Sequence, residues 1–172
     1  MSELASCTLE LRNMPVGVQQ FNYIVGNEFF RQMESADIRS GEVSVALTVV
    51  RKNEAFDLTF VMEGHIIVGC DRCLDDLRQE ISTEYHTVVR YGEEYNEDND
   101  EEIIIPEGER SFDLSHIIYD TIALTIPLKH VHPDGECNAE MIERLQEHSG
   151  SEETETTDSR WDALRNILDN DK

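Results

Sequence analysis

The fold is decided by one stretch of the sequence, Phe56-Asp-Leu-Thr-Phe-Val-Met-Glu-Gly-His-Ile-Ile-Val-Gly-Cys-Asp-Arg-Cys73. As far as Val68, apolar side chains occupy every second position, and Gly64 is the one gap in the alternation. Polar residues such as Asp57 and Glu63 lie between them. Because successive side chains of a β-strand point to opposite faces, this period predicts a strand with one buried face.

Two further alternating runs flank this strand. One precedes it at Val43, Val45, Leu47 and Val49, and the other follows it at Leu77, Ile81, Tyr85 and Val89. The short polar segment between the second and third runs predicts a tight connection. We therefore predict an antiparallel sheet built on a long β-hairpin over about residues 55–91, with Cys70 and Cys73 at its tip.

A helix over about residues 113–125 is predicted to pack on this sheet. Ser111 or Asp113 can cap its start, and Pro127 ends it. Its apolar face comprises Leu114, Ile117, Ile118 and Ile122. Short elements are also predicted: a strand at Thr8–Arg12, helices at Asn27–Glu34 and Asn138–His148, and a short C-terminal helix. Together these elements define an α+β fold.

The domain organisation follows from changes in composition. Residues 1–148 are predicted to form a single α+β domain. Within it, residues 93–102 hold seven acidic residues in ten positions and are predicted to be a loop, since they bury little apolar surface. Residues 149–159 have the composition of an acidic linker. Residues 160–172 form a short amphipathic segment that carries Trp161.

Charge restricts the function. The chain has 14 Lys and Arg residues against 37 Asp and Glu residues, which gives a net charge of −23. Proteins that grip nucleic acid neutralise phosphates with Lys and Arg. This surface is therefore expected to repel bare RNA, and it indicates either a solubilising role for the charge or a basic partner.

The compartment is predicted from what the sequence lacks. No apolar run approaches the roughly 20 residues of a membrane span, and the start of the chain does not resemble a signal peptide. A cytoplasmic protein with no membrane contact is therefore expected. In that reducing environment the four cysteines are expected to be thiols or metal ligands.

The Cys70-x-x-Cys73 pair is the one motif with chemical content. A turn can aim two thiolates to the same side, where they hold one metal ion, and zinc then needs two more ligands. Cys137 is the candidate third ligand, and His132 or His130 the candidate fourth. Zinc binding requires that the loop after Pro127 folds back onto the hairpin tip.

Two other interpretations of the pair stay open. A thiol–disulfide redox protein would place Cys70 at the start of a helix, whereas the alternation after Cys73 predicts a strand. Alternatively, Cys70 and Cys73 are ordinary turn residues and Cys137 packs alone. No Gly-rich phosphate loop or nucleophile elbow is present, so we predict no catalytic residues and no small-molecule substrate.

Several segments, taken in order, resemble the large ribosomal RNA subunit accumulation protein family, also called the YceD family. They are Val68-Gly-Cys-Asp-Arg-Cys-Leu-Asp75, the helix-to-proline segment 112–128, His132 to Cys137, and the closing motif 158–168. The resemblance covers roughly residues 40 to 170. The closing motif usually has proline where Ser159 stands.

The resemblance implies a non-catalytic accessory factor for large-subunit ribosomal RNA accumulation or ribosome assembly. The family's genes tend to neighbour one for a small zinc-ribbon ribosomal protein. Because a net charge of −23 disfavours a grip on RNA phosphates, the expected partner of such a factor is a basic ribosomal protein or a precursor of the large subunit. If RNA is contacted directly, Arg72 and Arg78 near the hairpin tip are the expected contacts. The resemblance adds Cys70, Cys73 and Cys137 as a candidate metal or structural cluster.

Overall fold

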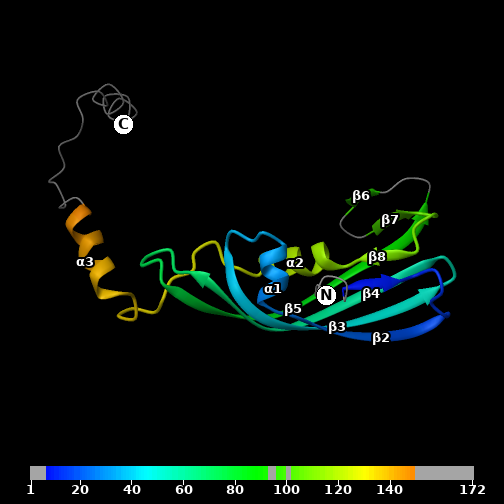
Figure 1. Cartoon of the computed structure of the whole chain (residues 1–172), viewed down its shortest axis with the longest axis horizontal. Helices are drawn as coiled ribbons and strands as arrows, with labels where there is room; N and C mark the ends of the chain where they lie inside the picture. The colour runs from blue at the N-terminus through cyan, green and yellow to red at the C-terminus, as the bar shows by residue number, and fades with distance from the viewer. Residues whose placement is uncertain (1–6, 93–95, 100–101, 150–172) are drawn as a thin grey trace, which may run out of the picture. The chain divides into compact units, whose positions relative to one another are not determined.

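The computed structural model describes residues 7–92, 96–99 and 102–149, and it confirms the α+β class (Figure 1). The main sheet has six strands in the order β2-β3-β4-β5-β7-β6, and β1 pairs with β8 in a separate two-stranded sheet. The strands of the main sheet are β2 (Gly17–Val25), β3 (Ile38–Lys52), β4 (Ala55–Gly69), β5 (Asp76–Gly92), β6 (Asn96–Asn99) and β7 (Glu102–Pro106). The remaining elements are β1 (Thr8–Glu10), β8 (Ser111–Asp113), α1 (Asn27–Gln32), α2 (Ser115–Ala123) and α3 (Ala139–His148).

The predicted hairpin is β4–β5, and its pairing runs without interruption from Ala55↔Arg90 to Gly69↔Asp76. β3 pairs with β4 on the other side, through a two-residue connection in which Asn53 has a φ of 55°. The left-handed conformation is one that Asn tolerates better than most residues. The three alternating runs of the sequence therefore lie on adjacent antiparallel strands.

One face of the main sheet is buried. Leu47, Phe60 and Tyr85 lie opposite one another in three adjacent strands, and residues of α1 and α2 belong to the same apolar cluster. On the opposite face Asn22, Ala46 and Glu84 are exposed. The alternation therefore reflects one buried face, as predicted. Side chains at even positions of β4 point into the core, and those at odd positions lie on the other face, where they are half-buried or exposed.

The helix expected at about 113–125 is α2. Leu114 stands at the N-cap, and no side chain makes a capping hydrogen bond from that position. The Asp113 carboxylate, one residue earlier, accepts a hydrogen bond of 2.9 Å from the backbone N–H of Ser115, so the predicted residue contributes an acceptor at the helix start but is not the N-cap itself. Ile118 and Ile122 are fully buried. The helices predicted at 27–34 and 138–148 are α1 and α3.

Two features of the sheet differ from the sequence-based expectation. The first is β2, which was not predicted: it lies at the sheet edge, and its half-buried face mixes Gln19 with Phe21 and Tyr23, so apolar alternation is weak. The second lies within residues 93–102, where Asn96–Asn99 forms strand β6 and Glu102 begins β7. β6 pairs with β7 because backbone hydrogen bonding needs no apolar side chains.

The chain divides into two compact units, residues 1–137 and 138–172. Composition predicts a single α+β domain as far as residue 148. In the second unit, the Asn138 side chain accepts hydrogen bonds from the backbone N–H groups of Glu140 and Met141 and caps α3. Apart from Ser149, the predicted linker and the C-terminal segment with Trp161 lie outside the described residues.

The gap in the β4 alternation generates a prediction about stability. A Cβ atom on Gly64 would lie 2.2 Å from the backbone oxygen of Glu42 in β3. Gly64→Ala therefore forces β3 and β4 apart, and we expect it to lower the free energy of unfolding by about 2 kcal/mol. Urea denaturation of the full chain measures this loss.

The matched control for this change is Gly108→Ala. A Cβ atom there meets nothing within 4 Å, so its stability should be within about 0.5 kcal/mol of the original. Equal midpoints for the two variants would show that the close approach of the strands does not constrain the sheet.

Candidate metal centre

Four side chains converge at the tip of the β4–β5 hairpin. They are Cys70, Cys73, His132 and Cys137, and their ligand atoms all lie within 4.8 Å of one another. The two Sγ atoms of Cys70 and Cys137 are 3.9 Å apart, and the Sγ of Cys73 lies 3.3 Å from Nδ1 of His132. Cys70 and Cys73 are buried, whereas His132 and Cys137 are partly exposed.

The first pair is positioned by the turn between β4 and β5. The backbone N–H of Cys70 donates to the Asp75 carbonyl, and that of Leu74 donates to the Cys70 carbonyl, both at 2.9 Å. Leu74 has a φ of 65°, which allows the chain to turn sharply before β5. The backbone N–H of Arg72 points at the Sγ of Cys70 from 3.4 Å and stabilises a thiolate there.

The second pair is positioned by the loop after α2, which folds back onto the turn. The Asp71 N–H donates to the His130 carbonyl at 2.9 Å, and the His130 N–H donates to the Asp71 carboxylate at 2.8 Å. The carboxylate also lies 3.4 Å from Nε2 of His130. These reciprocal contacts hold the loop against the hairpin tip. The predicted metal binding requires this arrangement of the loop.

The structure distinguishes between the two candidate histidines. The His130 ring contacts the Pro127 carbonyl and Asp71, outside the cluster, so it positions the loop. His132 directs Nδ1 at the sulfur atoms of Cys73 and Cys137, while its Nε2–H donates to the Asp76 carbonyl at 3.1 Å. In the neutral imidazole that hydrogen bond puts the proton on Nε2, which leaves the Nδ1 lone pair available for a metal ion.

A second layer of contacts holds the turn. Arg39 of β3 pairs with the Asp76 carboxylate at 2.6 Å and donates to the Leu74 carbonyl at 3.0 Å. A Cβ atom on Gly69 would lie 2.7 Å from the Arg39 guanidinium, so glycine leaves room for this arginine. The β3 strand thereby supports a site to which it contributes no ligand.

The electrostatics favour a thiolate at Cys70. Burial raises the pKa of this thiol, but hydrogen bonds from the backbone of Cys73, His132 and Arg72 and from the Cys73 side chain outweigh burial and lower the pKa to about 6. At Cys137, burial and the neighbouring cysteines both raise the pKa. Burial lowers the pKa of His132, but its hydrogen bonds to Cys70 and Cys73 exceed this effect, so the net pKa is raised.

The donor set fits zinc. Three sulfur atoms and one imidazole nitrogen are a common set for structural zinc, and tetrahedral Zn–S bonds of about 2.3 Å place two sulfur atoms about 3.8 Å apart. The Cys70–Cys137 separation of 3.9 Å matches that spacing. When bound, the ion would supply a cross-link between the hairpin tip and the loop after α2.

The redox hypothesis has less support from the geometry. Cys70 and Cys73 lie in a turn between two strands, so no helix begins at the motif and none lowers a thiol pKa through its N-terminus. The low pKa of Cys70 arises from hydrogen bonds of the turn and of the His132 backbone, which suit a metal ligand equally well.

The two arginines proposed for RNA contact have acidic neighbours. Arg72 lies 3.6 Å from the Asp134 carboxylate, and Arg78 lies 2.6 Å from that of Glu80. Their positive charges are therefore partly offset on the protein's own surface.

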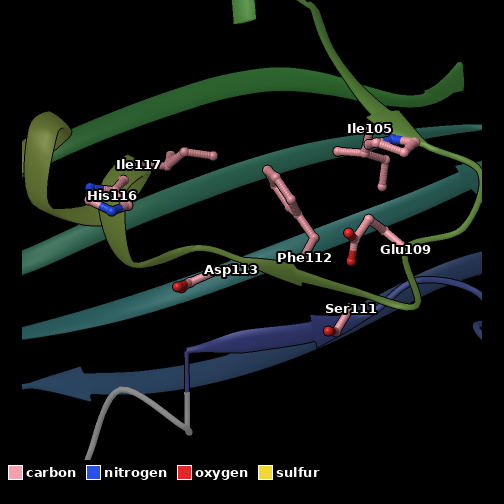
Figure 2. Close-up of a pocket in the computed structure, with 8 residues that line it drawn as sticks. Ile105, Glu109, Ser111, Phe112, Asp113, His116 and Ile117 are labelled. Atoms are coloured by element: carbon pink, nitrogen blue, oxygen red, sulfur yellow. The ribbon is translucent and has the colours of Figure 1, made fainter. Parts of the chain in front are cut away.

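A pocket lies away from the cysteines, between β7, β8 and the start of α2. It has a volume of about 400 Å³ and is lined by Ile105, Pro106, Glu109, Ser111, Phe112, Asp113, His116 and Ile117. Figure 2 shows Phe112 near its middle with the Glu109 carboxylate beside it. Sequence reasoning missed this pocket, because it depends on how the β8 segment returns to the sheet.

None of the helices in the described part of the chain has the length and apolar character needed to cross a membrane.

Fold and site together define a small α+β protein with a Cys₃His cluster at the tip of its longest hairpin. Residues 44–168 match the family model described as "Large ribosomal RNA subunit accumulation protein YceD". The chain therefore belongs to the YceD family, as its motifs predicted. No curated protein and no solved structure matches the chain. The family's name links the chain to accumulation of the large ribosomal subunit RNA.

The geometry of the cluster generates a prediction about metal content. The full chain, purified without chelators, should carry about one equivalent of zinc by elemental analysis, because four protein ligands converge on one point. Cys137→Ser and His132→Ala should each lose most of that metal and increase amide exchange in the loop after Pro127.

Cys7→Ala and His86→Ala are the matched controls, because neither residue belongs to the cluster. Both should retain the metal. Metal-free protein whose stability does not change on Cys137→Ser would contradict a metal centre.

Proposed function

We propose that this protein is a non-catalytic, zinc-stabilised accessory factor that supports accumulation of large-subunit ribosomal RNA in the cytoplasm. The observation that carries the proposal is the closed ligand set: three cysteines and one histidine leave no position of a tetrahedral ion open for substrate. A closed site stabilises structure, whereas catalytic zinc keeps an open position. Family membership supplies the ribosomal context.

The partner that we propose is a basic ribosomal protein, either alone or on a precursor of the large subunit. A net charge of −23 repels RNA phosphates and attracts basic proteins, and the salt concentration determines the distance over which these forces act. The partial neutralisation of Arg72 and Arg78 by Asp134 and Glu80 also favours a protein partner over direct RNA contact.

The pocket between β7, β8 and α2 is the proposed contact for a Lys or Arg side chain of that partner. Such side chains combine an apolar stem with a charged head. The pocket has the half-buried ring of Pro106 and the buried side chains of Ile105 and Phe112 in its wall, beside the exposed residue Glu109. Asp113 adds negative charge at the same site, while its carboxylate also accepts a hydrogen bond from the backbone N–H of Ser115 at the start of α2.

Glu109→Gln tests this contact without changing the hydrogen bond at the start of α2. We expect it to weaken binding to isolated basic proteins of the large subunit by about fivefold, the upper range for an exposed ion pair. Glu107→Gln is the matched control, since Glu107 is exposed nearby but does not line the pocket. Titration of each ribosomal protein against the full chain gives the affinities.

Salt dependence separates a protein partner from an RNA partner. Binding to a basic protein should weaken as salt rises, and removal of one carboxylate should weaken it further. Naked precursor RNA should bind more tightly once a carboxylate is removed, because repulsion of phosphates falls. Tighter RNA binding by Glu109→Gln, with no binding to any basic ribosomal protein, would overturn the proposed partner.

A further inference from the structure

The strand β2 lies at one edge of the main sheet and presents an unusual surface. Among the described residues it pairs only with β3, and Figure 1 shows it along the lower border of the sheet. All nine of its residues are in register with β3, without a bulge. Its outer edge therefore presents a row of backbone N–H and C=O groups suited to pairing with another strand.

This edge lacks the usual protection against such pairing. Natural proteins blunt edge strands with charged side chains, proline or bulges. Residues 13–27 contain no Asp, Glu, Lys or Arg, although charged residues make up 30% of the chain, and Pro15 precedes the strand. In a protein with so many charges, a charge-free edge marks a surface at which a second strand can approach closely.

The outward-facing side chains of β2 form a symmetric pattern. Val18 and Ile24 are exposed at 61% and 70% of their surface, and the polar residues Gln20 and Asn22 lie between them on the same face. Along the strand these four residues run apolar, polar, polar, apolar, and the midpoint between the first and the last of them is Phe21. A two-fold interface requires a patch that is complementary to itself: if residue i meets residue j of the other copy, residue j meets residue i, and a residue on the axis meets its own counterpart.

We infer that β2 pairs antiparallel with β2 of a second copy of this chain, about a two-fold axis at Phe21. In that register Val18 lies opposite Ile24 of the other copy, and Gln20 lies opposite Asn22. On the inner face Gln19 lies opposite Tyr23. The two main sheets become one continuous sheet across the dimer.

A second copy fits this edge better than a basic partner does. A basic strand would be recognised by carboxylates, and β2 has none. Two copies of net charge −23 repel each other, so they meet most favourably where the contact strand itself is neutral. Self-association should therefore strengthen as salt rises, the opposite of the dependence expected for a basic ribosomal protein.

Sedimentation or light scattering of the full chain tests the dimer. We expect a mass near twice 19.8 kDa at high protein concentration, with a dimer fraction that grows with salt. Val18→Glu combined with Ile24→Glu puts like charges opposite each other at both contacts and should yield monomer. Val18→Lys combined with Ile24→Glu puts opposite charges there and should restore the dimer.

Val61→Glu is the control for added charge, because Val61 is 41% exposed on the same sheet face but belongs to the interior strand β4. It should leave the dimer intact. Because Val18 and Ile24 are exposed, circular dichroism of their variants should match that of the original chain. A monomer at all salt and protein concentrations, or a dimer that survives Val18→Glu with Ile24→Glu, would overturn the inference.

Cross-linking tests the register independently. Since residue 18 faces residue 24 of the other copy, a mixture of Val18→Cys and Ile24→Cys proteins should form an intermolecular disulfide on mild oxidation. Each variant alone should form far less. Peptide mass mapping distinguishes this bond from bonds to Cys7, Cys70, Cys73 or Cys137. Equal cross-linking of each variant with itself would exclude the two-fold axis at Phe21.

Discussion

The register of the β4–β5 hairpin is the constraint on which the rest of the structure depends. Its pairs run from Ala55↔Arg90 to Gly69↔Asp76, and one residue of slippage would turn the core side chains of β4 toward solvent. The same register ends the ladder next to Cys70 and Cys73, which places the two thiols in a turn at the tip. Core packing therefore also determines the position of the cysteines.

The hairpin tip and the loop after α2 are both acidic, yet they lie against each other. Asp71, Asp75 and Asp76 belong to the tip, and Asp134 and Glu136 to the loop. Contacts of His130 with Asp71 and of Arg72 with Asp134 offset part of the repulsion. A divalent ion held by the four ligands would add the remaining cross-link and would shield its thiolates from one another.

The sequence predicted those parts of the molecule in which local pattern and burial agree. The β3, β4 and β5 runs alternate because one face of the sheet is buried, and Asp113 accepts a hydrogen bond at the start of α2 because the first N–H groups of a helix need acceptors. The candidate ligands Cys70, Cys73 and Cys137 could be picked out by residue type and spacing, and the structure brings them together. Spacing alone does not distinguish His132 from His130. The distinction depends on which histidine ring the Asp76 carbonyl orients.

Other features could not be predicted from local pattern. β2 was not predicted because its half-buried face consists of Gln19, Phe21 and Tyr23. Polar and apolar residues therefore do not alternate clearly along this edge strand. The parallel pairing of β5 with β7 joins segments separated by an acidic run whose composition favours a loop. The pocket between β7, β8 and α2 depends on the path of β8 across the molecule. The spacing of residues in the sequence does not indicate that path.

X-ray absorption at the zinc edge of the purified full chain reports the ligands of a bound ion and so tests whether the four side chains form a metal centre. We expect a first shell of three sulfur atoms at about 2.3 Å and one nitrogen at about 2.0 Å. A first shell made only of oxygen and nitrogen, or no bound metal at all, would contradict this metal centre.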